Sequence, residues 1–383
     1  MIQIRYSKNK FFVEDQSSID ILRKGSFGNL AAHVLVLHPE EVLYLMDVRN
    51  AECVSAGAPI SFNGIASRFW KSKKFTARYF TYKDWRDRGL MIKRPFKFRC
   101  EESAPSKEYP RSSIKLPKLK MNGTFFKSDL ITVVSEREAG KKIYEDLWFG
   151  QYGSYKAPDR GQLNKLDIYE TIFLVSDGIL HLGNITLEDL IKVATSRRRD
   201  FGRLYSVYKD WREKDYVIKT GFKFGTHFRV YFPGATPTKR NNASWVHSKH
   251  VIHVFPKESK MLISEWARAI RVAHSVRKTF ILAVPGKPSR HDVEIDYVLY
   301  HRKGGEAESP ENSKPRYAML SFSEDEHIGG SEFAAAVNSA RKMKLEPIIA
   351  IADRETSVTY YKIRQIKLAG SDNDYYEIDW FQP

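Results

Sequence analysis

The sequence is poor in cysteine, in long apolar runs and in acidic residues. It has only two cysteines, Cys53 and Cys100, in 383 residues, too few for a disulfide framework or a cysteine-rich zinc site. No apolar run reaches about 18 residues, so the sequence predicts no membrane span. Residues 1–10 are followed by no long apolar region of the kind found in a signal peptide. We therefore expect a cytoplasmic protein in a reducing compartment, with no membrane partner.

The shortage of acidic residues leaves a strong positive charge. Lys and Arg number 63 against 46 Asp and Glu, for a net charge of +17. Such an excess indicates a polyanionic partner, most simply a nucleic acid. The 20 Tyr and 7 Trp favour nucleic acid further, because aromatic rings stack on bases. A membrane surface is the alternative, but no basic amphipathic helix stands out.

Part of the chain occurs twice. Residues 82–86 and 208–212 are identical, and residues 91–98 match 217–224 at the same spacing of 126. Phe27 matches Phe149 at a spacing of 122, as does its surrounding segment. Several collinear matches with small drift in length indicate an internal repeat.

A shorter copy follows near the C-terminus. Residues 331–340 resemble 264–273, and residues 348–351 resemble 281–284, both 67 positions apart. The chain therefore reads as an N-half copy, a complete copy and a C-half copy, and we expect an α/β fold of α+β repeats in which small mixed sheets pack with helices. The expected boundaries are 1–103 for the non-catalytic first unit, 104–126 for a linker, 127–303 for the complete unit with subdomains of about 127–200 and 201–303, 304–313 for a second linker, and 314–383 for a non-catalytic structural unit.

The local patterns predict several elements. The amphipathic stretch 205–212 indicates a helix, followed by two strands that include Phe222 and Phe224. Asp167 is expected to cap one helix, and Ser264 another that ends near Lys278. We expect residues 280–284 to form a buried strand paired with 293–300. The tail 375–381 is too apolar to be left in water, so we expect it to pair or pack at an interface.

Three reactive side chains have no counterpart in the other copies by these spacings. They are Tyr231, His247 and Lys278, and Leu345 replaces the lysine in the third unit. A phenol, an imidazole and an ammonium suit RNA cleavage by the 2′-hydroxyl, which needs a base, an acid and a cation for the phosphorane. A phenol with a pKa near 10 needs a cationic neighbour to act as the base.

Each of these residues also has an ordinary structural interpretation. Tyr231 can be a core residue at a strand end, His247 an exposed loop residue, and Lys278 a partner of a helix dipole. A metal site at His247, His250 and His253 is not expected, because strand alternation places the last two on opposite faces. Serine, histidine and aspartate occur without a nucleophile elbow.

Three ordered motifs carry a specific resemblance. Residues 219–231, the pair His247-Ser248 and residues 271–278 resemble the archaeal tRNA-intron (tRNA-splicing) endonuclease family over nearly the whole chain. The resemblance implies that Tyr231 is the general base, His247 the general acid and Lys278 the stabiliser of the transition state. It further implies cleavage of precursor tRNA at bulge-helix-bulge junctions, 2′,3′-cyclic phosphate and 5′-hydroxyl ends, and no metal or other cofactor. His227 is interpreted as structural, and the basic insertion 236–242 leaves His250 as the alternative acid.

The resemblance also implies partners. Arg271 and Arg302 match the two arginines that flank a flipped bulge base, and guanidinium planes stack well on bases. The extended loop 151–160 presents Lys156 as a further RNA contact. The family assembles four units, so this three-unit chain is expected to form a homodimer in which an acidic turn, with Asp353 and Glu355, docks into a basic cleft. The alternative from another functional class is a non-catalytic RNA-binding scaffold.

Overall fold

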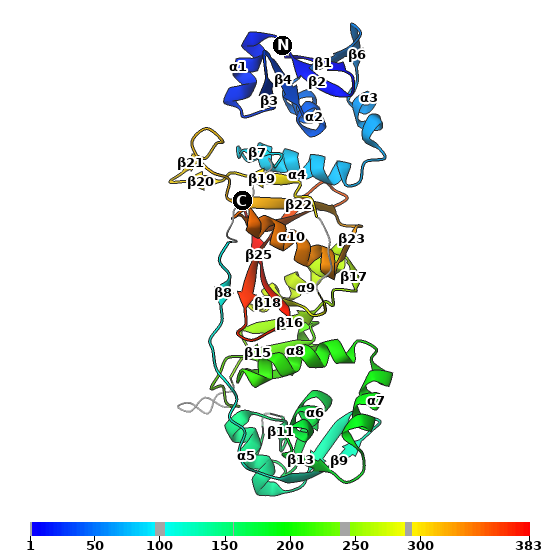
Figure 1. Cartoon of the computed structure of the whole chain (residues 1–383), viewed down its shortest axis with the longest axis vertical. Helices are drawn as coiled ribbons and strands as arrows, with labels where there is room; N and C mark the ends of the chain where they lie inside the picture. The colour runs from blue at the N-terminus through cyan, green and yellow to red at the C-terminus, as the bar shows by residue number, and fades with distance from the viewer. Residues whose placement is uncertain (1, 96–103, 156, 238–245, 288–292) are drawn as a thin grey trace.

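The computed structural model describes residues 2–95, 104–155, 157–237, 246–287 and 293–383. The chain is elongated, with one sheet at each end and a larger sheet between them (Figure 1). This arrangement confirms the mixed α/β class expected from the sequence. Within the described ranges, none of the helices combines the length and apolar composition needed to cross a bilayer.

The N-terminal layer is a six-stranded sheet with helices packed on it. Its strand order is β3 (Asn29–Ala31), β4 (Val34–Leu37), β2 (Lys10–Val13), β1 (Gln3–Ser7), β5 (Glu52–Ser55) and β6 (Ala58–Ile60). The helices of this layer are α1 (Gln16–Lys24), α2 (Pro39–Val48) and α3 (Phe62–Ala66), followed by a 3₁₀ turn at Ser67–Phe69. Helix α4 (Phe75–Asp87), which holds the repeated 82–86 motif, then leads to the central sheet.

A second copy of this layer lies at the opposite end of the molecule (Figure 1). Its five-stranded sheet has the order β11 (Gln151–Tyr152), β12 (Asn164–Asp167), β10 (Ile131–Val134), β9 (Met121–Phe126) and β13 (Leu180–Leu182). Its helices are α5 (Arg137–Leu147), α6 (Ile168–Ser176) and α7 (Leu187–Arg197), and α8 (Phe201–Glu213) leads to the central sheet. Asp167 caps α6 as expected, since its side chain accepts a hydrogen bond from the Glu170 amide at 2.9 Å.

The central sheet joins strands from all parts of the chain. Its order is β14 (Val217–Thr220), β15 (Phe228–Tyr231), β16 (His250–Val254), β18 (Thr279–Val284), β26 (Asp374–Phe381), β25 (Val358–Lys367), β24 (Glu346–Ala352), β22 (Tyr317–Ser323), β19 (Tyr297–Leu299) and β7 (Ile92–Lys93), with β8 (Lys107–Glu108) beside β25. Helix α9 (Ile263–Ser275) packs on β18 and β26, and helix α10 (Gly330–Lys342) packs on β22, β24 and β18. Strand β17 (Lys260–Leu262) pairs with β23 (His327–Gly329). A small hairpin of β20 (Arg302–Lys303) and β21 (Glu306–Ala307) projects beside β19.

The two halves of the central sheet repeat one another. On one side the order is β14, β15, β16, β18 and β26, and on the other it is β7, β19, β22, β24 and β25. Strand β7 follows α4 as β14 follows α8, so the N-terminal and C-terminal parts of the chain together form the second set. We call this set, with the N-terminal layer, the composite unit. Strand β26 confirms the expectation for the tail, because it pairs with both β18 and β25.

Three local expectations are wrong. Strand β19 does not pair with β18 but with β22 and β7, because it occupies in the composite unit the place that β15 occupies in the other half. Helix α9 begins at Ile263 directly after β17 and ends at Ser275, so Ser264 is not its cap. Phe222 and Phe224 form a 3₁₀ turn, because Gly221 packs against Thr226, where a Cβ would lie 2.5 Å from the threonine Oγ1, and Gly225 has a φ of +63°.

Candidate active site

Three neighbouring strands bring the predicted reactive residues together at one end of these strands in the central sheet. Strand β15 ends at Tyr231, and antiparallel β16 begins beside it, three residues after His247. Strand β18 runs parallel to β16 and begins directly after Lys278. All three side chains line a single cavity of about 510 Å³. The pairing of strands therefore assembles residues that lie 47 positions apart in sequence (278 − 231).

Tyr231 is held rigidly at the wall of this cavity. Its side chain is 5% exposed, and its ring lies 4.6 Å from the ring of Trp148 between centroids. Burial raises the pKa of Tyr231, while the positive charge of Arg229 and a hydrogen bond with Ser248 lower it. The phenol is thus a buried group whose ionisation is favoured by a cation of the same strand.

The position of Lys278 is set by the end of α9. Arg277 adopts a φ of +55°, and the Lys278 amide donates to the Ala273 carbonyl at 3.0 Å, so the chain reverses out of the helix into β18. Lys278 Nζ donates to Ser248 through its carbonyl oxygen and through Oγ, the latter at 3.1 Å. Burial and the charge of Arg229 lower the pKa of Lys278. Ser248 therefore lies between the phenol and the ammonium.

His247 lies on the open side of the cavity. It is exposed and belongs to the segment that precedes β16, whereas Ser248 next to it is buried. His250, the alternative acid, does not line this cavity, and its ring packs 4.9 Å from Phe232. The geometry therefore favours His247 over His250 as the group that reaches the other two. Among the described residues, no group of three or more His, Cys, Asp or Glu side chains is placed to hold a metal ion.

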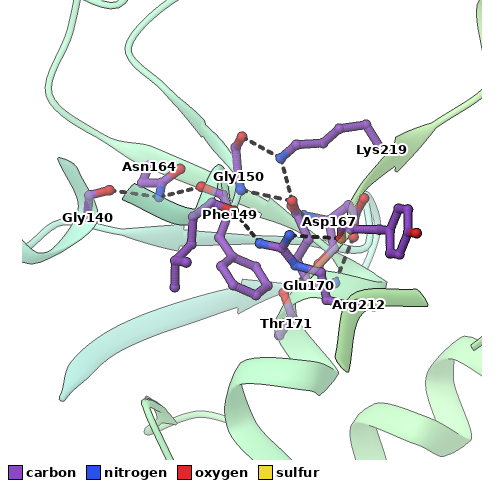
Figure 2. Close-up of polar contacts among 11 residues, drawn as sticks. Gly140, Phe149, Gly150, Asn164, Asp167, Glu170, Thr171, Arg212 and Lys219 are labelled. Carbon is purple, nitrogen blue, oxygen red and sulfur yellow. Dashed lines mark hydrogen bonds and ion pairs between the residues drawn. The ribbon is translucent and has the colours of Figure 1, made fainter. Parts of the chain in front are cut away.

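The cavity carries an excess of positive charge. Its lining contains five cationic side chains and two carboxylates, Asp167 and Glu170. Glu170 is neutralised by Lys219, whose Nζ lies 2.6 Å from its Oε1 and also donates to the Gly150 carbonyl at 2.9 Å (Figure 2). The remaining cations, Lys165, Lys223, Arg229 and Lys278, leave a site suited to an anionic ligand.

Comparison with known proteins agrees with this site. The family described as tRNA intron endonuclease, catalytic C-terminal domain, matches residues 201–297, a range that contains all three candidate residues. The tRNA-splicing endonuclease of Methanopyrus kandleri is 35% identical over 170 residues, which cover 42% of this chain and 86% of that protein. The chain belongs to the tRNA-splicing endonuclease family.

Other members of the family align over different shares of their length. The tRNA-splicing endonuclease of Methanococcoides burtonii is 33% identical over 187 residues, 48% of each chain, and that of Hyperthermus butylicus is 30% identical over 178 residues, 92% of that protein. The matched region is thus about half of the Methanococcoides protein and nearly all of the Hyperthermus protein. The family membership expected from the sequence motifs is confirmed.

Several residues that the family resemblance suggested lie outside the cavity. Arg271 is exposed on α9, near the hydroxyl of Tyr361, and Arg302 is exposed on β20, where its Nη2 donates to the Arg88 carbonyl at 2.6 Å. Neither arginine lines the cavity. Lys156 lies outside the described residues.

The acidic turn follows β24. Asp353 Oδ1 accepts hydrogen bonds from the Glu355 and Ser357 amides, both at 2.9 Å, and the Glu355 side chain is exposed. Arg354 is held by Asp325 at 2.8 Å. The turn is therefore a compact projection with the Glu355 carboxylate in solvent.

Sequence reasoning missed three further residues that line this cavity. Arg229 shares a strand face with Tyr231, since side chains alternate along a strand, and this alternation was the available signal. Phe222 and Tyr155 line the rim and are 86% and 56% exposed, with Lys223 Nζ 4.7 Å from the Tyr155 ring centroid. The wrong prediction of a strand at Phe222 concealed this residue. In a strand that continued from Lys219, Phe222 would point to the face opposite the cavity.

The composite unit also contains a tyrosine equivalent to Tyr231, which the sequence comparison did not find. In the catalytic half, Arg229 pairs with Lys219, and in the composite unit Val298 pairs with Lys93. Val298 is therefore equivalent to Arg229. Two residues further along the strand, Tyr300 is equivalent to Tyr231. A tyrosine at this position is therefore not confined to the middle unit. Leu345 still replaces Lys278, so the composite unit lacks the full set.

Proposed function

We propose that this chain is an RNA endonuclease that cleaves precursor tRNA at bulge-helix-bulge intron junctions. The observation that carries the proposal is the convergence of Tyr231, His247 and Lys278 on one cationic cavity. The matched catalytic domain and the relatives named tRNA-splicing endonuclease support it.

The three side chains supply every group that cleavage by the 2′-hydroxyl requires. Tyr231, as phenolate, takes the 2′-hydroxyl proton, and the 2′-oxygen attacks phosphorus. His247 gives its proton to the departing 5′-oxygen, and Lys278 offsets the negative charge of the phosphorane. The bond from phosphorus to the 5′-oxygen breaks as the bond to the 2′-oxygen forms, which yields a 2′,3′-cyclic phosphate and a 5′-hydroxyl. These residues perform the reaction without a metal or cofactor.

Cleavage of a bulge-helix-bulge RNA in EDTA tests this function. Wild-type protein is expected to release cyclic-phosphate ends, and Tyr231→Phe, His247→Ala and Lys278→Ala are each expected to lower the single-turnover rate by about 10² to 10⁴-fold. Tyr300→Phe is the matched control, because it removes the corresponding phenol of the composite unit and should leave the rate unchanged. Tight RNA binding by the wild type without cleavage would instead support a non-catalytic scaffold.

The unit boundaries support a particular assembly. The non-catalytic N-terminal unit at 1–103 and the structural unit at 314–383 surround a catalytic unit at 127–303, and the pairing of β7, β19 and β22 extends the composite unit back to residue 297. With one active and one composite unit per chain, a homodimer provides four units. The proposed working form is a cytoplasmic homodimer.

The acidic turn is the proposed docking element of this homodimer. Glu355 is exposed and the turn is stiffened by the Asp353 hydrogen bonds, which suits insertion into a basic cleft of the second copy. In sedimentation analysis, the double variant Asp353→Asn/Glu355→Lys is expected to shift the protein toward monomer. An unchanged dimer would contradict the docking role.

Arg271 and Arg302, which lie outside the cavity, remain proposed RNA contacts, and so does Lys156. The exposure of both arginines supports contact with RNA on the outer surface. Arg271→Ala and Arg302→Ala should each weaken RNA binding and reduce its salt dependence, whereas binding that is equal to wild type would contradict the role.

A further inference from the structure

Arg229 is placed to act on the same chemistry as the three proposed catalytic residues. It precedes Tyr231 by two positions in β15, so both side chains leave the strand on one face, and both line the cavity. The guanidinium carbon lies 5.8 Å from the centroid of the Tyr231 ring. On the neighbouring strand, Lys219 is its pairing partner.

The cations Lys219, Lys278 and Arg229 differ in whether their nitrogens have hydrogen-bond partners. Lys219 is matched by the Glu170 carboxylate at 2.6 Å, and Lys278 donates to Ser248. Arg229 Nε, in contrast, is buried with no hydrogen-bond partner among the described residues. A buried donor without a partner is costly unless a ligand satisfies it. The cavity therefore holds a guanidinium group ready to bind an anion.

Arg229 is also electrostatically linked to both neighbours. Its positive charge lowers the pKa of Tyr231 against the effect of burial, and it lowers the pKa of Lys278 in the same direction as burial. A base with a pKa nearer neutrality is a better proton acceptor at working pH. The arginine is thus the cationic neighbour that a catalytic phenol needs.

The composite unit offers an internal comparison. There, Val298 stands at the position of Arg229 and Leu345 at the position of Lys278, while Tyr300 is present. The Tyr300 phenol is 2% exposed, and burial raises its pKa with no other cause. The half of the molecule that lacks the lysine therefore also lacks the arginine, although it holds a tyrosine. This pattern links the two cations to a shared task.

We propose that Arg229 binds the scissile phosphodiester of the RNA through its guanidinium group, whose Nε has no partner among the described residues, and positions it against Tyr231 and Lys278. The inference rests on the proposed nuclease function and names a further residue of that same site. Arg229 takes no proton and forms no covalent bond. It holds the phosphate oxygens that become more negative in the transition state.

The ionisation of Tyr231 depends on several groups around it. From its own strand it faces Arg229, from the 151–155 segment it faces the Tyr155 phenol, and from the segment before β16 it has the Ser248 hydroxyl. The other charged or titratable groups of the cavity come from α5, β12 and α6, from β14 and the turn after it, and from the ends of the flanking loops. They are Tyr144, Lys165, Asp167, Glu170, Lys219, Lys223, His247 and Lys278.

The test compares two substitutions of this arginine with a charge-matched control. Arg229→Gln removes the charge, Arg229→Lys keeps it, and Arg23→Gln removes one charge from the exposed end of α1 in the N-terminal layer. Single-turnover cleavage of the bulge-helix-bulge RNA is measured with each protein over a pH series. Binding is measured with the same RNA carrying a 2′-deoxynucleotide at each cleavage site, and folding by circular dichroism and melting temperature.

The expected result separates charge from structure. Arg229→Gln should lose about 10² to 10³-fold in rate and bind the 2′-deoxy RNA about ten-fold more weakly, and its rate should rise at higher pH than in the wild type because the Tyr231 pKa is no longer lowered. Arg229→Lys should recover part of the rate and keep the wild-type pH profile. Arg23→Gln should match the wild type in rate and profile.

Specific outcomes would overturn the inference. If Arg229→Gln has the same rate and pH profile as Arg23→Gln, Arg229 does not act in the site. If Arg229→Gln and Arg229→Lys lose the rate equally and both have lowered melting temperatures, the role of Arg229 is structural. If Arg229→Gln does not fold, a pH profile of Arg229→Lys displaced from the wild type decides against the proposal. Failure of the wild-type protein to cleave would refute the nuclease function itself, and an intact affinity of Arg229→Gln for the 2′-deoxy RNA would then refute the phosphate contact separately.

Discussion

Lys219 Nζ lies 2.6 Å from Glu170 Oε1, and this ion pair joins strand β14 of the central sheet to helix α6 of the adjoining layer. The side chains are only 9% and 4% exposed. Glu170 Oε1 also accepts from the Gly150 amide at 2.9 Å, and Lys219 donates to the Gly150 carbonyl (Figure 2). We call this arrangement the layer clamp.

The two hydrogen bonds of the layer clamp to a glycine recur in the composite unit. Glu41 Oε1 accepts from the Gly28 amide at 2.9 Å, and Lys93 Nζ donates to the Gly28 carbonyl. The arginines of the two repeated helices also make equivalent contacts. The guanidinium carbon of Arg86 lies 3.8 Å from the Phe27 ring centroid, and that of Arg212 lies 3.9 Å from the Phe149 ring centroid. Because these glycine contacts are present where the catalytic set is incomplete, we infer that the clamp holds the layers together.

Loss of one clamp partner should therefore destabilise the fold. Lys219→Met leaves the Glu170 carboxylate buried without its cation, and we expect the free energy of unfolding to fall by about 3 to 5 kcal/mol in urea titrations. Lys192→Met, which breaks an exposed ion pair of 2.9 Å with Glu188 on α7, should leave the free energy of unfolding nearly unchanged. Equal effects of the two substitutions would contradict the clamp. The double variant Lys219→Met/Glu170→Gln should recover part of the loss.

Acid should weaken the protein through two buried histidines whose rings are in contact. The rings of His227 and His253 lie 4.6 Å apart, and His227 Nδ1 accepts from the Val254 amide at 2.9 Å. Burial lowers the pKa of His227 to about 3 and that of His253 to about 4. Both pKa values lie below the ordinary value of 6.5, so the stability is present above about pH 6.5 and is lost as pH falls toward 4 and 3.

The histidine effect is measured by the pH dependence of unfolding. We expect His253→Phe to reduce the loss between pH 6.5 and 4, by up to about 3 kcal/mol, because the titrating group is gone and the ring still packs on Phe280. His33→Gln, a change in an exposed histidine, should leave the dependence as in the wild type. An unaltered acid dependence in His253→Phe would show that other groups cause it.

Phe222 should contribute to RNA binding and not to stability. Its side chain is 86% exposed at the rim of the cavity, where a ring can stack on a base next to the cleavage site. Phe222→Ala is expected to raise the KM about ten-fold, with kcat and melting temperature unchanged, and Phe222→Trp should retain the wild-type KM. Trp70→Ala removes an aromatic that is 75% exposed in the N-terminal layer and serves as the control. A KM equal to the wild type in Phe222→Ala would exclude the stacking role.

The repeats, the mixed α/β class and the family could be predicted from the sequence alone, which also proposed the set Tyr231, His247 and Lys278 that the fold brings to one cavity. These features are local: a motif copied at constant spacing, or an alternation of apolar residues, is visible in one segment at a time. The interpretation of His227 as structural also agrees with its buried contact to β16.

Which segments share a sheet could be seen only in the three-dimensional fold. Strand β19 pairs with β7, which lies about two hundred residues earlier, and β26 enters between β18 and β25. Strand partners of this kind are selected by packing and hydrogen bonding over long sequence separations, and nothing in a segment's own periodicity specifies them. For the same reason, the position of Tyr300, the exposure of Phe222 and the partnerless Nε of Arg229 among the described residues became visible only once the strands were in place.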